Sequence, residues 1–275
     1  MRGTVFYKMS GSGNDFVILD GRATQTDSWS TERIRAVCDR RRGAGADGLV
    51  ILTPSTAEAV RMSYWNSDGS RAAMCGNAAL CSGRLAAYLE MVPAGEFCLL
   101  TEAGPVRVRA APSTEVAEIN LPDVELPPNA PMVSLGGGER WMTFLTVGNP
   151  HVVVRVDDIE KLDVLGRGKA LRFDPVFGPA GANVNFVAPS PVTGGRWLIR
   201  TFERGVEGET LACGTGTVAA ALALAHQGEA ALPTVFRSRG GPELSVRARL
   251  LGGQASDVWL AGQGLLVYRG IWEGI

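Results

Sequence analysis

The chain has 275 residues, a formal net charge of −1 and 45% hydrophobic residues, which is enough apolar material for one large or two modest domains. Charges of both signs are interspersed, so no basic face favours nucleic acid and no basic amphipathic helix favours a membrane surface. The N-terminal residues lack the apolar core of a signal peptide, and the apolar run at 218–225 is too short to cross a bilayer, so we expect a cytoplasmic protein.

The first half of the chain predicts strands that alternate with helices. A charged stretch at 31–41 predicts one helix, and a run of small residues at 77–90, directly after Cys75, predicts another. The predicted strands lie at 16–19, 48–52, 60–65 and 106–110. The Pro-rich stretch at 122–131 is then expected to link two domains.

The second half predicts the same succession of elements. Charged residues at 158–165 predict a helix, and a second run of small residues at 214–227 follows Cys213. The predicted strands lie at 151–156, 183–188, 196–202 and 244–250. A last strand near 264–270 lies beyond this succession, and we expect it to return to the first domain.

Short segments also repeat in order. Gly13-Asn14 is matched by Gly148-Asn149, and Gly45-Ala46-Asp47 by Gly181-Ala182-Asn183. Cys75 and Cys213 fall in the same register, so several landmarks share nearly one offset. We therefore predict an α/β protein of the α+β type with two pseudosymmetric domains. Each has a mostly antiparallel sheet wrapped around a central helix, over 1–121 (with the strand at 264–275) and 122–263.

The residue inventory argues against the common cofactors. Five cysteines are an odd number and do not suggest a disulfide framework. Without a Cys-x-x-Cys or paired-histidine spacing, a zinc site is not expected, and the three lysines argue against pyridoxal phosphate. The glycines at 11–13 lack the rest of a dinucleotide fingerprint. We expect no metal and no cofactor.

Two Cys-Gly helix starts point to one kind of chemistry. Free N–H groups and the helix dipole at a helix start favour a thiolate, and the following Gly76 and Gly214 let a carboxylate approach the backbone. Inversion of an amino-acid α-carbon needs a base on one face and an acid on the other. Cys75 and Cys213 are therefore predicted to be the two catalytic thiols of a cofactor-independent racemase or epimerase. Cys38, Cys81 and Cys98 are interpreted as structural, and His226 as a solvated or capping residue.

Several segments resemble the signature stretches of the diaminopimelate epimerase family, in the family's order: GNDFVILDG, WNSDGSRAAMCGN, GNPH, GANVNF and FERGVEGETLACGTG. The resemblance implies two pseudosymmetric domains, no cofactor, and interconversion of LL- and meso-diaminopimelate for lysine and peptidoglycan synthesis. It implies a small-molecule substrate, no nucleic-acid or membrane partner, and leaves a homodimer open.

The resemblance also implies roles for individual residues. His151 would pair with Cys75, and Glu203 with Cys213, to tune the thiols. The implied substrate-binding residues are Asn14, Asn66, Gly76, Asn77, Asn149, Asn183, Arg204, Gly214 and Thr215. Among them, Gly76, Asn77, Gly214 and Thr215 would hold the reacting carboxylate, and Asn66, Asn149, Asn183 and Arg204 the far amino-acid end. An arginine with asparagine amides suits an end that bears both a carboxylate and an ammonium group.

Two positions depart from the family pattern. Gly48 stands where some members carry a glutamine contact, and Leu80 where the helix after Cys-Gly-Asn often carries arginine. Three alternatives stay open. A related enzyme such as a histidine racemase or hydroxyproline epimerase would keep both cysteines. A thiol hydrolase or amidotransferase would use one nucleophilic cysteine with His151 as base. A non-catalytic amino-acid-binding protein would not exchange the α-proton.

Overall fold

The computed structural model describes residues 3–24, 26–127, 133–192 and 194–273. The chain divides into two compact units, which we call the first unit (Met1–Asn120 with Ala261–Ile275) and the second unit (Leu121–Leu260). Part of the predicted linker at 122–131 lies outside the described residues. No helix in the described part of the chain has both the length and the apolar character of a membrane span.

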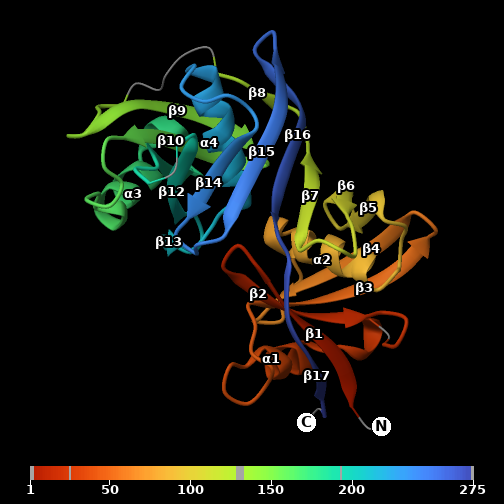
Figure 1. Ribbon diagram of the computed structural model, residues 1–275. Coiled ribbons are helices and arrows are strands. Elements are labelled where there is room, and N and C mark those ends of the chain that lie inside the picture. Colours follow the sequence, from red (N-terminus) through yellow and green to blue (C-terminus); the bar gives the residue numbers. More distant parts are fainter. Residues whose placement is uncertain (1–2, 25, 128–132, 193, 274–275) are drawn as a thin grey trace. The chain divides into compact units, whose positions relative to one another are not determined.

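The first unit holds a mixed sheet in the order β17-β1-β2-β3-β4-β5-β6-β7, in which only β2–β3 and β4–β5 are parallel pairs. Its strands are β1 (Thr4–Gly11), β2 (Asn14–Asp20), β3 (Gly48–Thr56), β4 (Ala59–Asn66), β5 (Gly95–Thr101), β6 (Gly104–Ala110), β7 (Val116–Leu121) and β17 (Leu265–Trp272). The chain's last strand, β17, thus lies beside its first strand, β1 (Figure 1).

The second unit repeats this pattern with β9-β10-β11-β12-β14-β15, where β10–β11 and β12–β14 are parallel. The strands are β8 (Val124–Glu125), β9 (Glu139–Val147), β10 (Asn149–Val156), β11 (Asn183–Pro189), β12 (Arg196–Glu203), β13 (Gly208–Thr210), β14 (Thr234–Ser238) and β15 (Glu243–Leu251). β16 (Gln254–Gln263) begins in the second unit and ends in the first. β13 pairs with β12, and β8 with β16.

Each parallel pair requires a crossover, and a helix supplies it. α1 (Thr31–Cys38) connects β2 to β3, and α2 (Gly76–Tyr88) lies between β4 and β5. α3 (Val164–Arg172) and α4 (Gly214–His226) take the matching places in the second unit. Two short 3-10 turns, η1 (Thr26–Ser28) and η2 (Pro175–Phe177), complete the elements.

The central helices are buried on nearly all sides because a sheet curves around each of them. α2 is buried from Asn77 to Ala87 and packs against β1, β2, β3, β4 and β6. α4 is buried from Gly216 to Leu224 and packs against β9, β10, β11 and β15. Small residues all round the helix allow this close packing. The predicted fold class, two similar domains with a mostly antiparallel sheet around a central helix, is confirmed.

The predicted helix at 158–165 is wrong. The charged residues that suggested it form a turn instead, in which the Asp158 carboxylate accepts a hydrogen bond from the Glu160 amide (3.1 Å). α3 begins only after Asp163, whose carboxylate caps the helix by accepting from the Gly166 amide (2.9 Å). The predicted helix at 31–41 is also too long. It ends at Cys38, and the Asp39 carboxylate accepts hydrogen bonds from the backbone amides of Arg41 and Arg42.

Candidate active site

Cys75 and Cys213 occupy equivalent positions at the N-caps of α2 and α4. Both residues have extended backbone, with φ/ψ of −140°/125° for Cys75 and −125°/112° for Cys213. Neither side chain caps its own helix, and both residues are half-buried. The amides of each first helical turn have no carbonyl within the helix to pair with. Each unit therefore presents a thiol beside the positive end of a helix dipole.

The other three cysteines lie elsewhere, and two of them are fully enclosed. Cys38 is 4% exposed at the end of α1, and Cys81 is 0% exposed inside α2. Burial raises the pKa of the Cys38 thiol to about 12, and it also raises the pKa of the Cys81 thiol. Both are thus protonated structural groups at neutral pH.

In the first unit, a chain of amides leads from the start of α2 into the sheet. The Asn77 amide donates to Asn14 Oδ1 (2.8 Å), and the Asn14 amide donates to Asp47 Oδ2 (2.9 Å). These two bonds fix which way each amide faces. Asn77 Oδ1, by contrast, is buried without a hydrogen-bond partner. A buried acceptor without a partner is rare, and this one directly follows Gly76 and the predicted catalytic Cys75 in the chain. It is the arrangement expected where a bound ligand supplies the missing donor.

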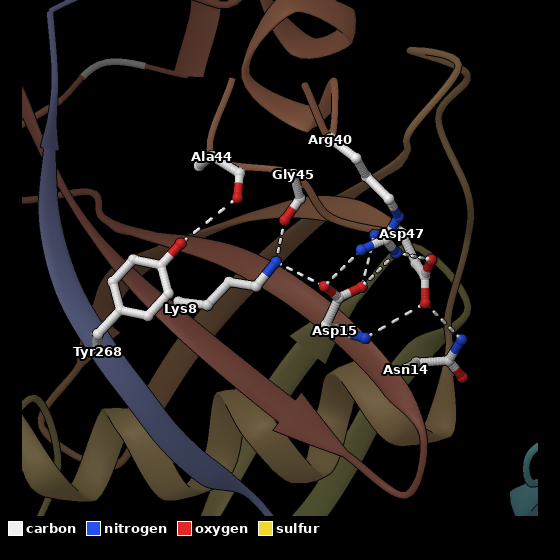
Figure 2. Close-up of polar contacts among 8 residues, drawn as sticks. All are labelled: Lys8, Asn14, Asp15, Arg40, Ala44, Gly45, Asp47 and Tyr268. Carbon is white, nitrogen blue, oxygen red and sulfur yellow. Dashed lines mark hydrogen bonds and ion pairs between the residues drawn. The ribbon is translucent and has the colours of Figure 1, made fainter. Parts of the chain in front are cut away.

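Asp47 belongs to a cluster of four charged groups that anchors this amide chain (Figure 2). Arg40 bridges Asp15 (2.8 Å) and Asp47 (2.6 Å), and Lys8, only 7% exposed, donates to Asp15 (2.6 Å) and to the Gly45 carbonyl. Burial would raise the pKa of Asp15, but the hydrogen bonds from Arg40 and Lys8 outweigh it and hold the pKa at about 2. Asp15 is therefore fully ionised at neutral pH, and Asp47, which Arg40 ties to Asp15, fixes the direction of the Asn14 amide.

Gly48 makes room for Tyr64, which in turn contacts Asn66. A Cβ atom at position 48 would lie 2.6 Å from the Tyr64 ring and 2.5 Å from the Trp65 carbonyl. The Tyr64 hydroxyl donates to Asn66 Oδ1 (3.0 Å), and the Asn66 amide donates to Ser70 Oγ (3.0 Å). Burial, and secondarily the charge of Cys75, raise the pKa of the Tyr64 phenol. The departure at Gly48 thus puts a neutral tyrosine hydroxyl against a predicted substrate-binding residue. The second departure, Leu80, is fully buried in α2 and belongs to the core.

In the second unit, Arg204 forms hydrogen bonds with two of the asparagines that are predicted to bind substrate. Its guanidinium donates to Asn149 Oδ1 (2.8 Å), and its backbone amide donates to Asn183 Oδ1 (2.9 Å). Asn183 also lies opposite His151 in the parallel β10–β11 pair. Three of the four residues predicted for the far amino-acid end are therefore adjacent, and Asn66 lies in the other unit.

His151 lies fully buried between two polar side chains of its own unit. Its Nε2 is 3.1 Å from Thr215 Oγ1, and its Nδ1 is 3.1 Å from the Asn185 amide nitrogen. Burial, aided by the nearby charge of Arg204, lowers the pKa of His151 to about 3. His151 is thus a neutral hydrogen-bonding group at physiological pH, and its predicted pairing with Cys75 stays a prediction.

Glu203 ends β12 and is half-buried. Burial raises the pKa of its carboxyl group, and the Thr210 hydroxyl acts in the opposite direction. Its predicted pairing with Cys213 stays a prediction. His226 is the exposed last residue of α4, in keeping with a solvated residue at a helix end. Within the described residues, no group of His, Cys, Asp and Glu side chains is arranged to hold a metal ion.

Sequence reasoning missed three residues that contact the predicted set: Asp47, Tyr64 and Asn185. Asp47 carries a detectable signal, since Gly45-Ala46-Asp47 is the counterpart of Gly181-Ala182-Asn183 and both segments place a polar residue after Gly-Ala. Tyr64 has the pattern of an ordinary strand residue, and Asn185 lies within the GANVNF segment without being singled out there. Tyr64 reaches Asn66 two positions along the same strand, and the register of β11 against β10 brings Asn185 to His151.

A family model described as diaminopimelate epimerase matches residues 6–120 and 143–249. A diaminopimelate epimerase from Gemmatimonas aurantiaca is 43% identical over 98% of this chain and 99% of its own length. One from Chlorobaculum tepidum is 38% identical over 95% of this chain and 98% of its own length.

Solved structures with low sequence identity share the fold. A hydroxyproline epimerase from Agrobacterium vitis with bound trans-4-hydroxy-L-proline superposes with a TM-score of 0.67 at 16% identity, covering 100% of this chain and 93% of that one. A phenazine biosynthesis protein of the PhzF family from Bacillus anthracis gives a TM-score of 0.69 at 12% identity, covering 98% and 99%.

Proposed function

We propose that this chain, which belongs to the diaminopimelate epimerase family, interconverts LL- and meso-diaminopimelate by an acid/base reaction of Cys75 and Cys213, in the synthesis of lysine and peptidoglycan precursors. The observation that carries the proposal is the duplicated helix start. In two repeats of one fold, a cysteine followed by glycine occupies the N-cap of the central buried helix.

The reaction needs one thiolate and one thiol. The thiolate takes the α-proton and becomes a thiol, and the opposite thiol gives its proton to the other face of the carbanion and becomes the thiolate. By family resemblance, Cys213 accepts the proton of the LL isomer and Cys75 donates. The reverse reaction exchanges these roles, so each turnover leaves the enzyme ready for the opposite direction.

The helix starts would stabilise the charge that develops on the substrate carboxylate. First-turn amides at Gly76, Asn77, Gly214 and Thr215 are the proposed donors, and their stabilisation increases as negative charge builds up in the transition state. The orphaned Asn77 Oδ1 supports a ligand at this place, because a bound ammonium or other donor would satisfy it. Asn14 holds Asn77 in the required orientation.

Recognition of the far end is proposed for Arg204, Asn149, Asn183 and Asn66. The Arg204 guanidinium matches a carboxylate in charge and shape. The asparagine amides offer both donors and acceptors, which an end that carries a carboxylate and an ammonium group requires. The adjacency of Arg204 with Asn149 and Asn183 supports this assignment.

The direct test is incubation of the purified protein with LL- and with meso-diaminopimelate, followed by chiral analysis. We expect each isomer to give the same equilibrium mixture. L-histidine and trans-4-hydroxy-L-proline serve as the comparison substrates, and we expect no inversion of either. Inversion of one of these, with diaminopimelate unchanged, would refute the proposed substrate.

Cys75→Ala and Cys213→Ala, each checked for retained folding by circular dichroism, test the two thiols. We expect either change to abolish epimerisation because the proton relay needs both groups. The matched control is Cys98→Ala, which removes a half-buried thiol away from both helix starts and should keep full activity. Near wild-type turnover in either of the first two variants would refute the mechanism.

A further inference from the structure

A continuous line of side chains in the second unit runs from the sheet to Cys213. It begins at Asn185 on β11, passes through His151 on β10 and Thr215 in the first turn of α4, and ends at the Cys213 sulfur. The steps measure 3.1 Å from Asn185 Nδ2 to His151 Nδ1, 3.1 Å from His151 Nε2 to Thr215 Oγ1, and 3.6 Å from Thr215 Oγ1 to Cys213 Sγ. His151 and Asn185 are both 0% exposed, so water does not compete at the inner end.

The orientation of the Asn185 amide is fixed by its neighbours. Its nitrogen lies 3.2 Å from the Val152 carbonyl oxygen, which can only accept a hydrogen bond. Its Oδ1 accepts a hydrogen bond from the Thr201 hydroxyl (3.0 Å). Thr201 lies on β12, directly opposite Asn185 in the β11–β12 pair. The side facing Val152 and His151 must therefore be the NH₂ group, and its two hydrogens serve these two acceptors.

This orientation determines the proton on His151. Since an N–H of Asn185 points at Nδ1, Nδ1 must be the acceptor nitrogen and the imidazole proton must be on Nε2. The Nε2–H group then donates to Thr215 Oγ1. A threonine hydroxyl that accepts there can use its own hydrogen toward the remaining neighbour, the Cys213 sulfur.

We propose that Asn185 is a positioning residue that keeps the His151 proton on Nε2 and thereby directs the Thr215 hydroxyl to donate to Cys213. A donor aimed at the sulfur favours the thiolate over the thiol. In this arrangement the neutral imidazole accepts from Asn185 through Nδ1 and donates to Thr215 through Nε2. The proposal rests on the proposed role of Cys213 in acid/base catalysis.

The packing of α4 against Asn185 keeps the line in place. A Cβ atom at Gly216 would lie 2.2 Å from Asn185 Oδ1 and 3.3 Å from Cys213 Cβ. The helix start therefore rests directly on the Asn185 amide, which glycine alone allows. The charged residue that acts on His151 is Arg204, and its positive charge disfavours a second proton on the ring, in agreement with a neutral imidazole.

Nitrogen NMR of histidine-labelled protein tests the inference without any assay of turnover. The chain has two histidines, so the spectrum holds two residues, and a His226→Gln variant identifies the signals of His151. We expect His151 to show a protonated Nε2 and an unprotonated Nδ1 near pH 7. A proton on Nδ1 in the wild-type protein would overturn the proposal, whether or not any variant folds.

Two variants test the effect on the thiol. The rate at which iodoacetamide alkylates Cys213, read by peptide mass spectrometry, should fall about three- to tenfold in Asn185→Leu, and by a similar factor in Thr215→Val. The double variant should be no slower than Thr215→Val, because both changes break the same line. Thr201→Ser, which keeps the hydroxyl at Asn185, is the matched control and should leave the rate unchanged.

The outcomes separate the inference from the proposed function. Additive losses in the double variant, or an unchanged rate in Asn185→Leu, would show that Asn185 does not act through Thr215. Asn185→Asp offers a second route if the leucine variant does not fold, because a carboxylate can only accept and should bring a proton to Nδ1 in the NMR spectrum. Failure of the wild-type protein to epimerise diaminopimelate, with these NMR and alkylation results intact, would refute the substrate and leave the positioning role standing.

Discussion

At the scale of single residues, Tyr64 and Gly48 form a matched pair on adjacent strands. The missing side chain at Gly48 leaves the space that the Tyr64 ring fills, and the tyrosine hydroxyl then orients Asn66. A glutamine at position 48, as the family resemblance would have it, collides with the ring and with the Trp65 carbonyl. The two positions therefore have to change together.

Tyr64→Phe removes the hydroxyl and leaves the ring. We expect KM for diaminopimelate to rise about three- to tenfold, as for one lost hydrogen bond, with kcat nearly unchanged because Asn66 is assigned to binding. Steady-state kinetics of the variant measure this. Tyr88→Phe, which changes an exposed tyrosine on α2, is the control. A fall in kcat at constant KM would instead place Tyr64 with the reacting groups.

Arg204→Lys keeps the positive charge and loses the planar fork. Activity on diaminopimelate should fall at least about tenfold, since a lysine cannot hold both a carboxylate and Asn149 in the same geometry. Alkylation of Cys213 should stay at the wild-type rate. Arg196→Lys, at an exposed ion pair with Glu243, serves as the control. Unchanged kinetics would point to another residue as the carboxylate partner.

At the scale of elements, the two glycines near the helix starts have different tasks. A Cβ atom at Gly76 would meet only Ile119 Cδ1 at 3.8 Å, so the fold has room for it. At Gly216 the same atom would collide with Asn185. Gly76 thus leaves free space at the helix start, as the proposed carboxylate site requires, whereas Gly216 serves packing.

Gly76→Ala should therefore separate activity from stability. We expect the melting temperature to stay the same or rise slightly, because alanine favours a helix by up to about 1 kcal/mol over glycine. Epimerisation should fall because the new methyl group obstructs the approach of a carboxylate to the first-turn amides. Gly216→Ala should instead lower the stability by about 1–3 kcal/mol. Calorimetry with activity assays distinguishes these cases, and a fully active Gly76→Ala variant would remove this helix start from the binding site.

The sequence predicted these helices well for a physical reason. Runs of small apolar residues such as 214–227 have no polar face, so they fit only a helix that is enclosed on all sides. The charged stretch at 158–165 gave a wrong helix prediction because aspartates are found in turns and helix caps as well as in exposed helices. Here Asp158 forms a turn and Asp163 caps α3. Which of these roles a residue takes depends on contacts made elsewhere in the fold.

The candidate site could be proposed from the sequence only in part. Residues within a repeated motif, such as Cys75, Cys213 and Asn183, could be singled out as candidates because the duplication marks them. Asn185 and Tyr64 were not singled out, since the role of Asn185 depends on the register of β11 against β10, and that of Tyr64 on the space that Gly48 leaves on the neighbouring strand. Arg40 is likewise 25 positions from Asp15 and contacts it only because β2 and β3 lie side by side.

At the scale of the whole molecule, acid stability should report on the charge cluster of the first unit. The folded pKa of Asp15, about 2, lies below its ordinary value of 3.8. A depressed carboxylate pKa stabilises the fold fully above the unfolded value, and this contribution is lost as the pH falls from about 4 towards 2. After allowance for solvent screening, we expect a loss of about 1 kcal/mol from this group.

Urea unfolding of wild type and Asp15→Asn between pH 2 and pH 7 measures this contribution. The variant should be less stable at pH 7 by about 1–3 kcal/mol, because Lys8 remains buried without its carboxylate partner. The difference should shrink as the pH approaches 2. Asp27→Asn, an exposed aspartate, is the control and should show neither effect. A constant difference across the pH range would exclude Asp15 as the titrating group.

The two-thiol reaction is tested most directly by where solvent hydrogen appears. Pure LL-diaminopimelate is incubated with the protein in heavy water. The isomers are separated at low conversion, and the deuterium content of each is measured by mass spectrometry. If Cys213 removes the α-proton and a deuterated Cys75 delivers to the other face, meso product carries deuterium at the inverted carbon from the first turnover. The remaining LL isomer stays mostly unlabelled, because reversal returns the proton held on Cys213. Substantial unlabelled meso product at low conversion would contradict the account, since it would mean that one base serves both faces.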